Sequence, residues 1–576
     1  MKKFSKILLI TLLVMVLVTA LVACKEEDTH KGEFTHTINN VDDLKKISEM
    51  LGSDYDQGIF ELKADLTISD ENWAPIGTSV DSSFRGTFVG NGHTITYKIN
   101  IDEPLERDTT ATVPDEKFYG IFGVVHGATI SNLNVYVDIA IPADASSNYV
   151  GGLVGFMSGD CNISNVNVSG NIATTMGNLC RFIPQEDGSE LRELERYSMA
   201  GYIGGLAGYA KGNSKISNVN SSVSINVGAY NDGAYVSALN DVFVGGIVGS
   251  MRPINLSSLK DNNAVCSAKN LTYTGMINAK GNLVNAGGIF GAAYRINDGE
   301  KWVVNSSKVT ASACKRLRVG GVAGIIDRVN LNKTSAKVSQ ISAETFSSSA
   351  SRSFNVGGLV GYVANFSAIE NAIIAVDKIS VAVNVNNYTG GLVGMLHFSS
   401  IKNAVADGTL YYGRDSILTI STISYAGNTR NNAYYTYNGG IVGRVYGEST
   451  LDNLSTKFTA YQGIVGELAN AVEIVNIKEG EGETYEGWLG NTVYKSSQIS
   501  VNKEGALEDG EQKYRVIHNY DISANNYTYI STNSRCNNDI PQYPNATERL
   551  VEVGSGVADS TSYDALYNSI NSAINA

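Results

Sequence analysis

The side chains best suited to recognise a ligand are the tyrosines that gather between residues 411 and 437. The whole chain has 31 tyrosines. Flat aromatic rings stack on sugar rings and give rigid contact area in protein recognition, and a guanidinium group donates hydrogen bonds to oxygen acceptors. A β-surface also favours tyrosine, so the same residues could simply cover a sheet. The candidate ligand-binding residues are Tyr411, Tyr412, Tyr425, Arg430, Tyr434, Tyr435 and Tyr437.

The other residue types that carry chemistry do not fall into catalytic or metal-binding patterns. None of the six histidines has a spacing typical of metal ligands. A polysaccharide lyase or hydrolase would need two facing carboxylates, or acids beside an arginine or lysine base. The acids Asp160, Asp327 and Asp377 lie at unrelated positions of the repeat described below. We therefore predict no catalytic site, no metal site and no cofactor, with a carbohydrate-active enzyme as the alternative.

The overall charge argues against two classes of partner, nucleic acid and anionic lipid. The formal net charge is −13 and the isoelectric point is near 5.1. Such acidity argues against binding to nucleic acid and to anionic lipid headgroups. Of the six cysteines, one lies in the N-terminal segment discussed below, and an odd five cannot all pair. Among Cys161, Cys180, Cys266, Cys314 and Cys536, the first two are the candidate disulfide.

Any such site must be positioned by a glycine motif that recurs through most of the chain. The motif reads hydrophobic-Gly-Gly-hydrophobic-apolar-Gly, and the last glycines of successive copies are 23 to 53 residues apart, which is typical of a stacked repeat. Partial copies occur at residues 119–123 and 462–466. The full copies are residues 150–155, 203–208, 244–249, 286–291, 319–324, 356–361, 389–394 and 438–443.

An asparagine accompanies the glycine motif. In seven copies it follows the last glycine by nine or ten residues, although the distance to the next copy varies widely. The motif and the asparagine therefore belong to one rigid unit, and the variable lengths are loops. Three copies depart from the pattern: the expected position after Gly249 holds Ser258 and Leu259, Asn305 follows Gly291 by fourteen residues, and Asn332 follows Gly324 by eight. We expect interruptions of an asparagine ladder at those three copies.

These features predict an all-β fold, a right-handed parallel β-helix. Glycine pairs allow backbones to approach closely or to take positive φ at a corner, and the flanking runs alternate as strands do. An asparagine at a fixed corner can bond to its equivalents on neighbouring coils, which stack one on the next. A propeller also repeats near forty residues, but the short strands here lack hairpin turns at two-residue spacing, and the units vary too much in length.

The glycine motif followed by Ile-x-Asn resembles the GLUG-motif repeat family of bacterial surface and secreted proteins. The segments Trp73–Gly77 and Phe84–Ile95 are similar to the usual opening of that family. The resemblance covers roughly residues 34 to 476 and implies a scaffold at the cell surface, often described as adhesin-like. The family offers no agreed catalytic residues to transfer.

The N-terminus predicts export and lipid anchoring. Three lysines precede an apolar run from Ile7 to Ala23, as in a secretory signal peptide. The closing Leu21-Val22-Ala23-Cys24 resembles the lipobox of bacterial lipoproteins, which implies acylation of Cys24. The alternative is an uncleaved membrane-spanning anchor, for which the run is short. We expect an extracytoplasmic, surface-exposed protein held at the cell membrane by its N-terminal lipid.

The chain divides into five predicted regions. A short amphipathic helix from Asn40 to Leu51 is expected to cap the first coil, and Arg181 to Met199 is expected to form a helical insertion. A terminal helix is expected over Asp559 to Ala576. The regions are 1–23 signal peptide, 24–33 tether, 34–117 N-terminal cap and first coils, 118–476 repeats, and 477–576 C-terminal cap or small domain with a terminal helix.

Together these features predict a lipid-anchored extracellular β-helix scaffold without turnover. It would act as an adhesin-like module that binds glycans or proteins of a host or cell surface. The alternatives are the carbohydrate-active enzyme, with its groove along the coils, and a purely structural spacer.

Overall fold

The fold is described from a computed structural model. It covers residues 34–53, 56–69, 73–101, 116–144, 147–176, 180–184, 190–194, 200–229, 241–253, 266–345, 354–382, 387–412, 436–446, 449–456, 465–469, 472–475, 485–489, 492–496, 499–506, 512–518, 527–530, 550–553 and 560–575. The predicted lipidation site Cys24 lies outside these ranges.

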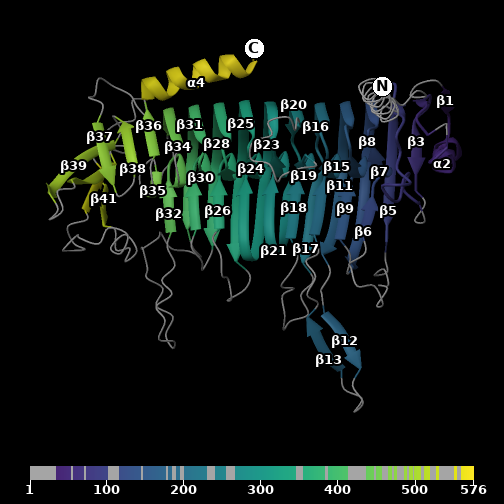
Figure 1. Cartoon of the computed structure of the whole chain (residues 1–576), viewed down its shortest axis with the longest axis horizontal. Coiled ribbons are helices and arrows are strands. Elements are labelled where there is room, and N and C mark those ends of the chain that lie inside the picture. Colours follow the sequence, from purple (N-terminus) through teal and green to yellow (C-terminus); the bar gives the residue numbers. More distant parts are fainter. Residues whose placement is uncertain are drawn as a thin grey trace, which may run out of the picture.

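Each repeat winds once around a parallel β-helix, and Figure 1 shows the strands stacked side by side along the long axis. One coil consists of β9 (Ser147–Gly151), β10 (Val154–Ser158) and β11 (Asn162–Met176). All three pair in parallel with the next coil, for example Val150 with Ile203. We call the three sides of the coil the first, second and third face. The predicted parallel β-helix is therefore confirmed.

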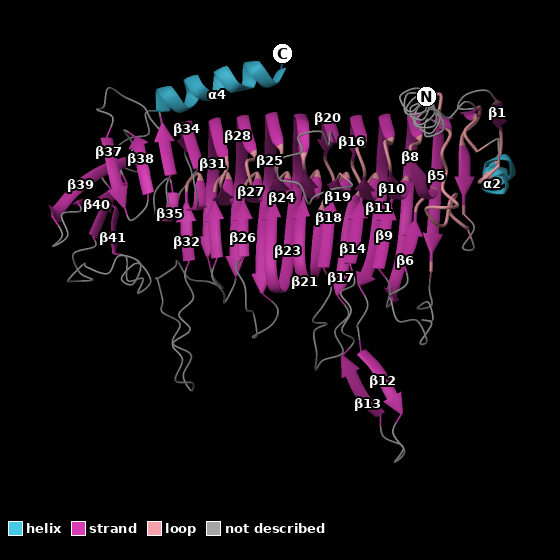
Figure 2. Ribbon diagram, in the orientation of Figure 1, coloured by secondary structure: helices cyan, strands magenta, loops and turns pink. Residues whose placement is uncertain are grey.

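The three faces contain most of the strands, which dominate Figure 2. The first face has β6 (Glu116–Tyr119), β9, β14 (Ala200–Gly204), β18 (Asp241–Gly245), the ends of β21 (Ile277–Gly287) and β23 (Ile296–Gly320), β26 (Phe354–Gly357), β29 (Asn387–Gly390) and β32 (Thr436–Gly439). The second face has β7 (Phe122–His126), β10, β15 (Ala207–Lys211), β19 (Val248–Arg252), β22 (Phe290–Tyr294), β24 (Ala323–Asp327), β27 (Val360–Ala364), β30 (Val393–His397), β33 (Val442–Tyr446) and β35 (Val465–Ala469). The third face has β8 (Thr129–Asp144), β11, β16 (Lys215–Ser221), β17 (Ser224–Ala229), β20 (Cys266–Tyr273), the starts of β21 and β23, β25 (Asn330–Thr345), β28 (Ala368–Ala382), β31 (Ser400–Tyr412), β34 (Ser449–Thr456) and β36 (Val472–Val475).

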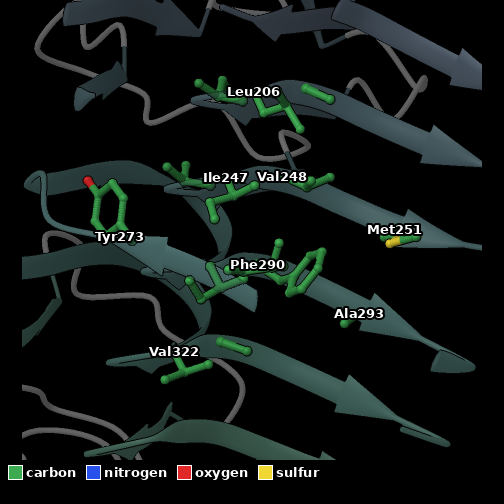
Figure 3. Close-up of a cluster of buried hydrophobic side chains, with 14 of the residues drawn as sticks. Leu206, Ile247, Val248, Met251, Tyr273, Phe290, Ala293 and Val322 are labelled. Atoms are coloured by element: carbon green, nitrogen blue, oxygen red, sulfur yellow. The ribbon is translucent and has the colours of Figure 1, made fainter. Parts of the chain in front are cut away.

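The interior is a continuous column of aliphatic and aromatic side chains. Leu206, Ile247 and Val322 occupy equivalent positions on different coils, all are fully buried, and Figure 3 shows them one above another. Burial of each such side chain stabilises the fold by about 1.5–3 kcal/mol. Because each coil contacts only its neighbours, this column is what holds the stack together.

The glycine pair of the motif is required at the corner between the first and second faces. A Cβ on Gly151 would lie 2.0 Å from the carbonyl oxygen of Val154 in its own coil. A Cβ on Gly152 would lie 2.4 Å from the carbonyl oxygen of Gly205 in the next coil. Any side chain at either position would therefore separate backbones that the corner brings together.

The corner asparagines lie at a bend of the third face and hydrogen-bond to one another from coil to coil. Asn165 has a φ of 56°, in the left-handed region that asparagine tolerates better than most residues. Its Nδ2 donates to Asn132 Oδ1 at 3.1 Å, and its Oδ1 accepts from Asn218 Nδ2 at 3.0 Å. The predicted ladder is confirmed. Its two described runs are Asn132, Asn165, Asn218 and Asn270, and Asn332, Asn371, Asn403 and Asn453.

The predicted interruptions of the ladder were wrong in one copy and partly right in two. Asn270 continues the first run, because the extra residues after Gly249 come before the corner and leave its register with Asn218 intact. In the next two coils the corner is kept by Lys301 and Lys333, with φ of 55° and 58°. These lysines follow the last glycine by ten and nine residues, so the corner persists without an asparagine. In the coil of Lys333 the neighbouring Asn332 joins the ladder instead, because its Oδ1 accepts from Asn371 Nδ2 at 2.9 Å.

The N-terminal coils and the capping helix precede the repeats. The strands β1 (Thr35–Ile38), β2 (Ile59–Leu62), β3 (Leu66–Ile68), β4 (Thr87–Val89) and β5 (Thr94–Asn100) join the stack in parallel. Helix α2 (Val41–Met50) lies at this end in Figure 1. The side chain of Asn40 caps the helix by accepting from the Asp43 amide at 2.9 Å, and Leu44 and Ile47 are buried. The predicted helix is confirmed.

The C-terminal helix lies along the outside of the stack. Helix α4 (Ser560–Asn575) contacts four strands, β25, β28, β31 and β34. Tyr563 and Ile570 pack on Ile373 and Val405, which project outward from the third face. Antiparallel hairpins lie at the end of the stack beyond β36 in Figure 1. They are β37 (Tyr485–Leu489) with β38 (Thr492–Ser496), β39 (Ile499–Ala506) with β40 (Gln512–His518), and β41 (Tyr527–Ile530) with β42 (Leu550–Val553).

Two further predictions were wrong. The insertion after Met176 contains a hairpin of β12 (Cys180–Pro184) and β13 (Glu190–Leu194) instead of a helix. The Asp-Gly pair between these strands is typical of a tight turn, and it outweighs the three-residue leucine spacing. The proposed bridge from Cys161 is also wrong, because its thiol is buried in the core and donates to the Ser158 carbonyl oxygen at 3.0 Å.

Candidate binding surface on the outside of the coils

One row of side chains projects outward from the first face along the stack. Successive strand residues alternate between the two sides of a sheet. Val150 points into the core, so its neighbour Tyr149 points outward, and the parallel register repeats this arrangement on each coil. We call these residues the outer row. Its described members are Phe118, Tyr149, Tyr202, Phe243, Asn285, Arg318, Asn355 and Tyr388.

A second row projects outward from the second face and meets the outer row across the corner. We call it the facing row, and it includes Phe156, Tyr209, Ile325, Tyr362, Met395 and Arg444. The ring centroids of Tyr202 and Tyr209 are 4.5 Å apart, and those of Tyr149 and Phe156 are 5.5 Å apart. At the N-terminal end of the two rows, Tyr149, Phe156 and Tyr209 form a cluster separate from the main core, with Phe118 and Tyr202 packed against it.

The N-terminal half of the outer row is a stack of aromatic rings. The centroid distances are 5.0 Å from Phe118 to Tyr149, 5.2 Å from Tyr149 to Tyr202, and 4.9 Å from Tyr202 to Phe243. Phe118, Tyr202 and Phe243 are partly exposed, whereas Tyr149 is buried. The register of the coils thus produces a run of rings with edges open to solvent.

Burial keeps the hydroxyl groups of this stack neutral. It raises the pKa of Tyr202 to about 12. It also raises the pKa of Tyr149, with a further increase from Glu116, whose carboxylate accepts the Tyr149 hydroxyl at 2.9 Å. At neutral pH the stack is therefore uncharged, and the exposed edges of its rings are suited to apolar contact with a ligand.

The C-terminal half of the surface combines arginines with tyrosines. The Arg318 guanidinium lies 4.6 Å from the ring centroid of Tyr362, and that of Arg444 lies 5.0 Å from Tyr388. Arg444 Nη1 also donates to the Tyr388 hydroxyl at 2.7 Å. One coil after Tyr362, the Nδ1 atom of His397 is 3.3 Å from the Tyr362 hydroxyl. The two arginine–tyrosine contacts are geometrically suited to cation–π attraction.

The acids proposed for catalysis are not brought together. The Asp327 carboxylate is buried and bound by Arg328 Nε at 2.7 Å and by Asn365 Nδ2 at 2.7 Å. Asp160 and Asp377 are exposed on other coils. Among the residues that the structure describes, no group of three or more histidines, cysteines or acids could hold a metal ion. Within the same residues, no helix is long and apolar enough to cross a membrane.

The predicted tyrosine patch is only partly within the described residues. Tyr425, Arg430, Tyr434 and Tyr435 lie outside them. Tyr411 and Tyr412 end β31, where Tyr411 pairs with Ser380, and Tyr437 lies in β32. The backbone of Tyr437 pairs with Tyr388, which places this residue in register with the outer row.

The outer row itself was missed by reasoning from the sequence. Its members share one signal, because each immediately precedes the first residue of the glycine motif. Aromatic residues occupy that place in the first four copies. The fixed position before the motif therefore points to the surface more directly than tyrosine density does.

Comparisons with known proteins support the repeat family. A family model described as the GLUG motif matches residues 146–173, which hold one glycine motif and its corner asparagine. The resemblance seen in the sequence is confirmed there. None of the curated proteins compared with the chain matches it. A solved structure described as a "putative immunoglobulin A1 protease" from Bacteroides ovatus is 14% identical, with a TM-score of 0.30, over 72% of this chain and 84% of that one. A likeness at that level carries no functional argument.

Proposed function

We propose that this protein is a lipid-anchored extracytoplasmic scaffold that binds glycans or cell-surface proteins without turnover. The observation that carries the proposal is the stack of partly exposed rings at Phe118, Tyr202 and Phe243. Neighbouring strands are about 4.8 Å apart, so the rings form a ladder with that period. Such a ladder suits a long polymer whose flat faces lie against successive ring edges.

The anchoring half of the proposal depends on the N-terminal segment. Acylation of Cys24 would hold the chain at the cell membrane with the β-helix outside. The test is metabolic labelling with a radioactive fatty acid in a bacterial host, followed by membrane fractionation. Wild-type chain should be labelled and sediment with membranes, and Cys24→Ala should be unlabelled. Labelling of the variant would contradict the proposal.

The binding half is tested with the chain from Lys25 onward, which keeps every described residue. It is presented to a panel of immobilised glycans and cell-surface extracts, and retention is measured. Tyr202→Ala and Phe243→Ala should each weaken retention about twofold to tenfold, because an aromatic contact contributes about 0.5–1.5 kcal/mol. Tyr136→Ala is the matched control, since Tyr136 is 39% exposed on β8 of the third face. Equal retention by all three variants would exclude the outer row as the binding surface.

One observation favours the alternative of a carbohydrate-active enzyme. The Tyr362 hydroxyl lies 3.3 Å from His397 Nδ1, and Arg318 covers the same ring. Burial lowers the pKa of His397, which leaves a neutral imidazole able to accept a proton at neutral pH. New reducing or unsaturated ends in the retained glycans would support the enzyme. Their loss in His397→Ala would assign it to this pair.

A further inference from the structure

Three arginines on this surface each lie over a tyrosine ring and follow one another along the stack. Arg252 lies 5.4 Å from the ring centroid of Tyr209, in addition to the pairs formed by Arg318 and Arg444. All three guanidinium groups belong to partly exposed residues. Stacking holds each guanidinium group in one orientation, and that of Arg444 is fixed further by its hydrogen bond to the Tyr388 hydroxyl at 2.7 Å.

Arg318 is the central member, and its charge is poorly compensated. Among the described ion pairs none includes Arg318, and its Nε atom is buried without a hydrogen-bond partner. The nearby carboxylate of Asp327 is already engaged by Arg328 and Asn365. Burial, with repulsion from Arg316 as a smaller contribution, lowers the pKa of Arg318 to about 10. A partly buried cation without a counter-charge is destabilising, so a ligand anion would relieve the cost.

The neighbours of Arg318 in the outer row add acceptors for hydroxyl groups. Asn285 and Asn355 lie on the strands immediately before and after Arg318 and are 1% and 2% exposed. The Oδ1 atom of each is buried without a hydrogen-bond partner in the described structure. Buried polar atoms are normally satisfied, so each such atom calls for an explanation. A ligand with alternating carboxylate and hydroxyl groups would satisfy this row, because a carboxylate pairs with the guanidinium group and a hydroxyl donates to an amide oxygen.

From this arrangement we infer that the surface binds a polyanionic glycan whose sugar units carry carboxylates. The inference rests on the proposed function, and it specifies the class of ligand. Arg252 precedes Arg318 by two coils and Arg444 follows it by three. At about 4.8 Å per coil, the guanidinium groups are spaced about 10 Å and about 14 Å along the axis. An extended chain of uronate sugars lying along the stack can place carboxylates at such intervals, where each can accept hydrogen bonds from a guanidinium group.

An acidic peptide is the less suitable partner. Extended peptides usually bind to a sheet by adding a strand to an open edge. Strands of the first face around Arg318 are paired on both sides, so no edge is open there. Recognition must therefore use side chains, which favours a polymer of rings and hydroxyl groups.

The test measures binding of the chain from Lys25 onward to polygalacturonate, its methyl ester, a neutral galactan and polyaspartate. We expect polygalacturonate to bind, and we expect its affinity to fall with added salt, because the contacts are partly exposed. Arg318→Met should bind it about tenfold or more weakly, since a hydrogen bond to a charged group contributes about 1.5–3 kcal/mol. Its unfolding midpoint should be unchanged or higher, which separates lost binding from misfolding. Lys337→Met, a charge loss at an exposed position of β25, should bind as wild type does.

The outcomes separate this inference from the proposed function. Equal binding of polygalacturonate and its methyl ester, or unchanged binding by Arg318→Met, would overturn the carboxylate site. Polyaspartate binding as tight as polygalacturonate binding would overturn the glycan class. Galactan retention that Tyr202→Ala abolishes, without polygalacturonate binding, would retain the proposed function and reject the inference. Absence of retention on every glycan and cell-surface extract would reject both.

Discussion

The corner asparagine offers the sharpest test of how the coils are held in register. Asn165 adopts a φ of 56° and bonds through its side chain to Asn132 and Asn218. Replacement by alanine removes both hydrogen bonds. It also leaves the left-handed conformation to a residue that has a Cβ and no polar side chain to bond locally. Replacement by glycine removes the same bonds but tolerates the backbone conformation.

The expected losses follow from three contributions. Two exposed amide hydrogen bonds contribute about 1–2 kcal/mol together, at the lower end of the usual range. The left-handed conformation costs alanine about 1–2 kcal/mol. Glycine avoids that cost but gives up about 0.5–1 kcal/mol to the greater freedom of the unfolded chain. We expect Asn165→Ala to lose about 2–4 kcal/mol, and Asn165→Gly to lose about 0.5–1 kcal/mol less.

The assay must report on local stability, because stacked repeats need not unfold in one step. Native-state hydrogen exchange of the amides in β8, β11 and β16 gives the free energy of opening around the corner. Lys333→Gly is the matched control at a corner with a φ of 58°, since its side chain pairs with Glu300 and is no part of the amide ladder. If the alanine and glycine variants of Asn165 lose equal free energy, the backbone argument is refuted. If the glycine variant loses nothing, the ladder does not stabilise the stack.

Three further predictions follow from the packing and the buried hydroxyl groups. Gly152→Ala should lower the free energy of unfolding by more than about 3 kcal/mol, because the added Cβ would meet a backbone oxygen at 2.4 Å. A smaller loss, measured by urea unfolding, would mean that the corner can open. Stability should be constant below pH 10 and fall as pH rises above it, since burial raises the folded-state pKa of Tyr149 and Tyr202 above the unfolded value near 10. Urea midpoints measured from pH 8 to 11 should fall less steeply in Tyr202→Phe. An unchanged slope would contradict the assignment. Ile570→Asp should release α4 from Val405, seen as rapid protease cleavage before residue 560 with the coils intact, whereas Ser569→Asp on the exposed side of the helix should remain protected.

Several features of the fold could be predicted from the sequence because they depend on local chemistry. Only glycine fits where the motif brings two backbones together, as at Gly151, and asparagine is favoured at a left-handed corner such as Asn165. Helix α2 carries its signal in its cap residue and its apolar spacing. The predicted helix after Met176 failed because two leucines at a spacing of three are a weak helix signal, whereas the Asp-Gly pair between β12 and β13 in the sequence favours a hairpin.

What the sequence alone determined is the unit of the fold, namely a coil with a glycine corner, an asparagine corner and apolar residues between them. Which side chains meet on the outside was decided only by the tertiary structure. Tyr362 lies beneath Arg318, and Asn270 bonds to Asn218, although in each pair the residues are far apart in the chain. The physical reason is that insertions change the distance along the chain without changing the register in which coils stack. A row of side chains across coils therefore has no fixed period in the sequence, yet it forms one continuous surface.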